Sequence, residues 1–86
     1  MPEISRFFGI VVSMYFDDHP LPHFHAFYAG EEVEVAIETR KIVNGRISSR
    51  ALALVAEWAA IHVDELRADW ALAKAGQPLS KIAPLR

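Results

Sequence analysis

The spacing of the apolar residues changes near the middle of the chain, from the period of a strand to the period of a helix. Val33, Val35 and Ile37 alternate with other residues, as in a strand with one buried face. Apolar residues over 51–62 recur instead every three or four positions, as on a helix. The sequence therefore predicts a single α+β domain over residues 1–86, in which two helices pack on one face of an antiparallel sheet of three to four strands. We expect strands over 6–16, 23–28, 32–38 and 41–43, helices over 48–62 and 64–75, and an extended C-terminal tail.

Composition excludes several classes of protein. The 86 residues include no cysteine, which excludes a disulfide scaffold, a thiol nucleophile and a cysteine-based zinc site. No apolar run reaches the roughly 18 residues of a membrane span, and the first residues do not resemble a signal peptide. The net charge of −2 argues against broad electrostatic binding to nucleic acid. We expect a cytoplasmic protein with no membrane contact.

Three of the four histidines, His19, His23 and His25, are close together in the sequence. Side chains alternate between the two faces of a strand, so His23 and His25 share a face. We expect residues 30–31 to form a two-residue hairpin turn, which places His23 opposite Glu38. The predicted register therefore gathers His23, His25 and Glu38 on a polar face of the sheet.

A pair of imidazoles beside a carboxylate is suited to acid–base catalysis, because an imidazole exchanges protons near neutral pH. In this interpretation one of His23 and His25 is the base, the other is the acid, and Glu38 orients a ring. The residues expected to contact the phosphate of a substrate are Tyr15, Arg46 and Arg50. Replacing either histidine by alanine is expected to abolish the effect on cell growth and to leave folding largely intact.

The same residues have other interpretations. The two rings can brace the sheet by pairing with Glu38 and Tyr15, and two histidines with a carboxylate also match a catalytic zinc set. We expect no metal cofactor, because these ligands lie on solvated strand edges without the supporting residues that orient metal-binding histidines. His19 is expected to be solvated. The other candidates are expected to be turn caps, core or interface residues: Asp17, Asp18, Trp58, His62 and Trp70.

A series of short motifs runs through nearly the whole chain. They include Ile4–Ile10, Met14–Phe16, Pro22–His25, Ile37–Thr39, Arg50–Leu52, Glu57–Trp58, Asp69–Trp70 and Pro78–Leu85. In order and spacing these motifs resemble the domain-of-unknown-function 4160 (DUF4160) family. The resemblance implies a small bacterial or archaeal protein, often encoded beside a domain-of-unknown-function 2442 partner, and some members are regarded as toxins. It marks Pro22, His23 and His25 as the signature segment, and it implies no particular reaction.

The sequence and the resemblance together predict the toxin-like component of a two-gene toxin–antitoxin module, with a domain-of-unknown-function 2442 protein as the cognate antitoxin. Its substrate would be RNA or another nucleotide phosphodiester, cleaved without a metal. The alternative is a non-catalytic interaction module that binds a cognate partner. Partner binding or self-association is expected to use apolar residues of the second helix and tail: Trp70, Leu79, Ile82 and Leu85.

Overall fold

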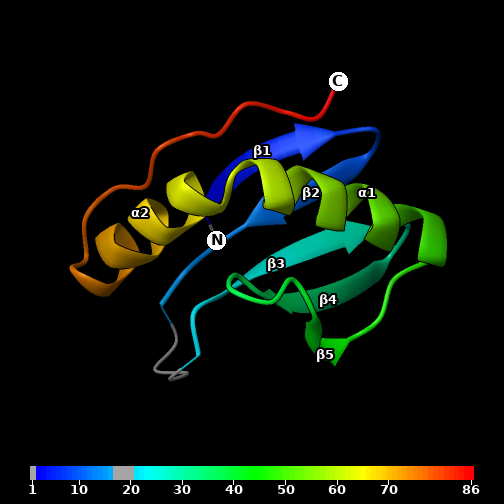
Figure 1. Ribbon diagram of the computed structural model, residues 1–86, viewed down its shortest axis with the longest axis horizontal. Helices are drawn as coiled ribbons and strands as arrows, with labels where there is room; N and C mark the ends of the chain where they lie inside the picture. The colour runs from blue at the N-terminus through cyan, green and yellow to red at the C-terminus, as the bar shows by residue number, and fades with distance from the viewer. Residues whose placement is uncertain (1, 17–20) are drawn as a thin grey trace.

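The computed structural model describes residues 2–16 and 21–86, and it shows a five-stranded antiparallel sheet followed by two helices (Figure 1). The α+β class is confirmed, but the expected three to four strands was wrong by at least one strand. The strands are hydrogen-bonded in sequence order, and the elements are β1 Glu3–Phe7, β2 Ile10–Ser13, β3 His23–Tyr28, β4 Glu31–Ala36, β5 Ile42–Gly45, α1 Ser49–Ile61 and α2 Val63–Lys74.

The additional strand arises from a hairpin at the N-terminus. The sequence suggested one strand over 6–16, whereas the chain turns at Phe8 and Gly9 and pairs β1 with β2. Both turn residues have positive φ, 50° for Phe8 and 79° for Gly9. Phenylalanine rarely adopts this conformation, so the apolar sequence concealed the turn.

The hairpin between β3 and β4 fixes the register that matters for the histidines. Its turn is formed by Ala29 and Gly30, both at positive φ as a type I′ turn requires, rather than by residues 30–31. His23 consequently lies opposite Ala36, and the prediction that it lies opposite Glu38 was wrong. The shift is two residues, so every side chain stays on its predicted face while its cross-strand neighbour changes.

Helix α1 packs on the apolar face of the sheet. Its Trp58 is fully buried, with ring centroids 5.5 Å from Phe7 and 5.8 Å from Phe24. Ser48 caps the helix by accepting a hydrogen bond from the Ala51 amide. The sheet residues of this core that are fully buried are Ile4, Ile10, Val12, Phe24, Ala26, Val33 and Val35.

The C-terminal residues 77–86 contain no helix or strand, and hydrogen bonds attach them to α2, β1 and α1. The amide of Ile82 donates to the Ile4 carbonyl of β1, and the indole of Trp58 donates to the Ala83 carbonyl. Ile82 is buried, and Leu79 and Leu85 pack against the core. Figure 1 shows this segment running past α2 and along β1. Within the part of the chain that the structure describes, no helix has the length and apolar character needed to cross a membrane.

Candidate functional site

His23 and His25 lie side by side on the sheet face opposite the apolar core face, and both are buried. Their exposed fractions are 0% and 2%, and their ring centroids are 5.2 Å apart. The Nδ1 atom of His23 lies 2.8 Å from the Leu21 carbonyl, which can only accept, so this nitrogen donates. The Nδ1 atom of His25 bonds Oε2 of Glu32 at 2.9 Å. Each ring is therefore held through Nδ1.

Two glutamates of β4 accompany the two histidines. Glu34 is the direct cross-strand neighbour of His25, and its Oε1 lies 3.5 Å from Nε2 of His23. Glu32 lies one step further along the same face and contacts His25. Direct and diagonal neighbours on one face of an antiparallel pair are close enough to interact. The sequence reasoning missed both glutamates as site residues, although strand alternation already placed them on the histidine face.

Aromatic rings surround the histidines. Tyr15 stacks on His25 with ring centroids 4.7 Å apart, Phe27 stacks on the same ring at 6.4 Å, and Trp70 of α2 lies 5.3 Å from His23. Such apolar neighbours limit the access of water to the imidazoles. Tyr15, expected to contact phosphate, thus lies at the histidines as a stacking partner.

The structure does not bring the other predicted site residues to the histidines. Glu38 forms a two-point ion pair with Arg67 of α2, at 2.9 and 2.6 Å, which lowers the pKa of its carboxyl group. Arg46 lies 3.6 Å from Glu31. Arg50 lies on the opposite face, in a groove beside α1. The predicted phosphate-binding arginines therefore do not form one site with His23 and His25.

The remaining candidates for functional residues lie in three places. Asp17, Asp18 and His19 lie outside the described residues. His62 sits between the helices, bonds Glu65 and packs on Trp58. Trp58 and Trp70 belong to the core.

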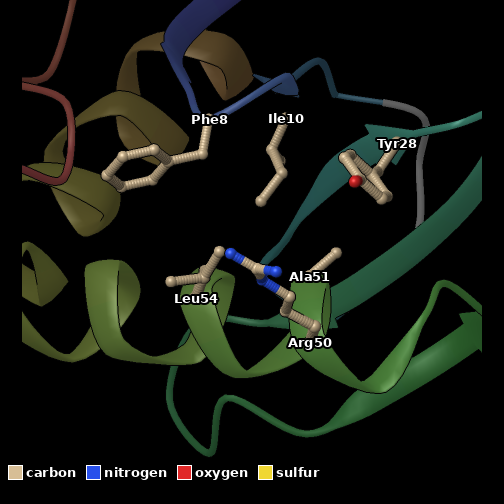
Figure 2. Close-up of a pocket in the computed structure, with 6 residues that line it drawn as sticks. All are labelled: Phe8, Ile10, Tyr28, Arg50, Ala51 and Leu54. Atoms are coloured by element: carbon tan, nitrogen blue, oxygen red, sulfur yellow. The ribbon is translucent and has the colours of Figure 1, made fainter.

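The groove beside α1 is the second candidate site (Figure 2). Figure 2 shows Phe8 and Ile10 of the first hairpin facing Leu54 and Arg50 of α1, with Tyr28 at one end. Phe8 is 60% exposed, and Ile61, seven residues beyond Leu54 and thus on the same side of the helix, is 63% exposed. Arg50 forms no ion pair with another described residue. This surface combines exposed apolar side chains with a cation that has no carboxylate partner within the described ranges.

The fold and the two sites define an α+β domain with a histidine–glutamate cluster on one sheet face and a groove beside α1 on the other. The family model for the domain of unknown function DUF4160 matches residues 9–71. The chain therefore belongs to the DUF4160 family. No curated protein and no solved structure matches it.

Proposed function

We propose that this protein acts by binding a protein partner, as the toxin-like component of a two-gene module whose other product is the cognate antitoxin. The observation that carries the proposal is the exposed Phe8 at the mouth of the groove. Phe8 is 60% exposed in a turn at positive φ, a conformation that phenylalanine rarely adopts, so most of its ring is available to a partner. Aromatic anchors beside a pocket are typical of the residues that dominate protein interfaces.

The groove specifies the chemistry of its partner. The exposed Phe8 and the half-buried Leu54 suit contact with an aliphatic or aromatic side chain. The guanidinium of Arg50 suits a carboxylate beside that side chain, because bidentate pairing with arginine gives strong and directional hydrogen bonds. We therefore expect the cognate partner to insert an apolar residue with an adjacent aspartate or glutamate.

Phosphodiester cleavage by His23 and His25 is the second candidate function, and their close approach supports it. Partner binding has the better support, because both rings are buried and the arginines expected to bind phosphate lie elsewhere. A general acid or base must reach the reacting atom directly or through one water molecule. Growth arrest that persists in a folded His25→Gln variant favours binding, and loss of arrest with retained partner binding favours cleavage.

The test is calorimetric titration of the full chain with the product of the neighbouring gene. Phe8→Asn removes the aromatic ring and suits the positive φ, because asparagine tolerates this conformation better than phenylalanine does. We expect this variant to bind at least about tenfold more weakly, as for a moderate interface anchor. The matched control is Ile42→Thr, which changes an exposed apolar residue of β5 away from the groove. Equal affinity for Phe8→Asn and the unmodified protein would rule out the groove as the interface.

A further inference from the structure

We propose that His23, His25 and Glu34 form a binding site for one divalent transition-metal ion, with Zn²⁺ as the representative ion. One donor atom from each of the three residues lies within 4.8 Å of the other two. Two imidazoles and a carboxylate are a ligand set that zinc and other first-row divalent ions accept. The site lies on the sheet face opposite the groove and does not depend on partner binding.

The hydrogen bonds at Nδ1 prepare both rings for a metal. Because Nδ1 of His23 donates to the Leu21 carbonyl, the lone pair of the neutral ring is on Nε2, which faces Glu34. Nδ1 of His25 bonds Glu32 in the same way. Metal-binding histidines almost always donate their other ring N–H to a carbonyl or a carboxylate, which fixes the tautomer and the ring orientation. These supporting residues, which the sequence did not reveal, remove the reason for expecting no metal.

The buried Nε2 atom of His25 is a second, independent observation. This atom is inaccessible to solvent and has no hydrogen-bond partner among the described residues. A buried polar atom without a partner costs free energy, and native proteins rarely leave one unsatisfied. A bound cation would satisfy it, since the Nε2 lone pair is the donor that an imidazole offers to zinc.

Distances and charge agree with this assignment. Ligands of a tetrahedral zinc ion lie roughly 3.3 Å apart for bonds of about 2.0–2.1 Å, and the His23–Glu34 pair is separated by 3.5 Å. The side chain of Glu34 is 20% exposed, so it can adjust inward and it gives an ion a way in from solvent. Glu32 and Glu34 supply two negative charges beside the two rings, which matches a divalent cation. Three protein ligands leave a fourth position for water, as in catalytic zinc sites.

The experiment is titration of the full chain, first treated with a chelator, with ZnCl₂ and separately with CoCl₂. We expect one ion per chain with micromolar or tighter affinity, a raised melting temperature, and the visible absorption of tetrahedral cobalt. Glu34→Gln keeps the shape of a partly exposed side chain and is expected to weaken binding at least about tenfold, in line with the loss of one ligand. His25→Gln is expected to abolish the cobalt spectrum.

The matched control is His62→Gln, because His62 also pairs with a glutamate, Glu65, but has no third ligand among the described residues. Its zinc affinity should equal that of the unmodified protein. Absence of saturable binding, or equal affinity for Glu34→Gln and the unmodified protein, would overturn the proposal. Because Glu34 is partly exposed, the Glu34→Gln result stands even if His25→Gln fails to fold. The metal titration does not involve the partner, so failure of the proposed partner binding would leave its result unchanged.

Discussion

The two faces of the sheet are both buried around β3, but by different means. On one face Phe24 and Ala26 belong to the apolar core, where Trp58 of α1 packs on Phe24. On the other face His23 and His25 are covered by aromatic rings and held by a carbonyl and a carboxylate. Apolar burial stabilises by removing surface from water, whereas buried polar groups stabilise only when their hydrogen bonds are satisfied. The first face supports the fold, and the second retains polar atoms that folding alone does not require.

The largest effect on the free energy of unfolding is expected for a substitution on the apolar face. Trp58→Ala removes a fully buried indole and its hydrogen bond to the Ala83 carbonyl, and should lower the free energy of unfolding by about 3–5 kcal/mol. Urea denaturation followed by circular dichroism measures the loss. The control on the same helix is Glu57→Ala, which changes an exposed residue and should stay within about 0.5 kcal/mol. If Trp58→Ala lowered the free energy of unfolding no more than this surface control does, the packing of α1 on the sheet would contribute little to stability.

An intermediate effect on the free energy of unfolding is expected for a substitution on the histidine face, measured without metal. The solvated face inferred from the sequence implied that His25→Ala would barely change stability. Because the ring is 2% exposed and stacked between Tyr15 and Phe27, its removal should cost about 2 kcal/mol, as for other buried side chains. Urea denaturation in the presence of a chelator measures it. A cost within about 0.5 kcal/mol, as for a surface substitution, would show that this face is open in solution, and would weaken the contrast between the two faces.

The two faces also show which features of the structure could be predicted from the sequence. Strand alternation correctly separated Phe24 from His23 and His25, because a side chain's face depends only on the parity of its position. The cross-strand partners could not be predicted, because they depend on the turn, and Ala29 at positive φ gives no sequence signal. The turn at Phe8 could not be predicted either, because Phe8 also has positive φ and its residue type gives no sign of it. The positions of the two histidines were therefore predicted on the correct strand and face, but the carboxylate beside them is Glu34 and not Glu38.

The smallest effect on stability is expected for Glu38→Gln. This variant tests whether Glu38, the carboxylate expected beside the histidines from the sequence, has the role that we propose for Glu34. Glu38 is exposed and pairs with Arg67, so this substitution should leave the zinc affinity unchanged, whereas Glu34→Gln weakens it. The ion pair with Arg67 lowers the pKa of Glu38 in the folded state. A lowered pKa stabilises the folded state above the unfolded value, and this contribution is lost as the pH falls through the folded value.

Removing Glu38 should therefore lower the melting temperature slightly at pH 7 and not at all once the pH is below the folded pKa of the carboxyl group. The difference at pH 7 should also shrink in high salt, because exposed ion pairs are screened and contribute little. Melting curves of Glu38→Gln and the unmodified protein across this pH range, at low and high salt, provide the measurement. A large loss of zinc affinity in Glu38→Gln would instead place Glu38 at the histidines and restore the register expected from the sequence. Unchanged affinity would leave Glu34 as the carboxylate that completes the cluster.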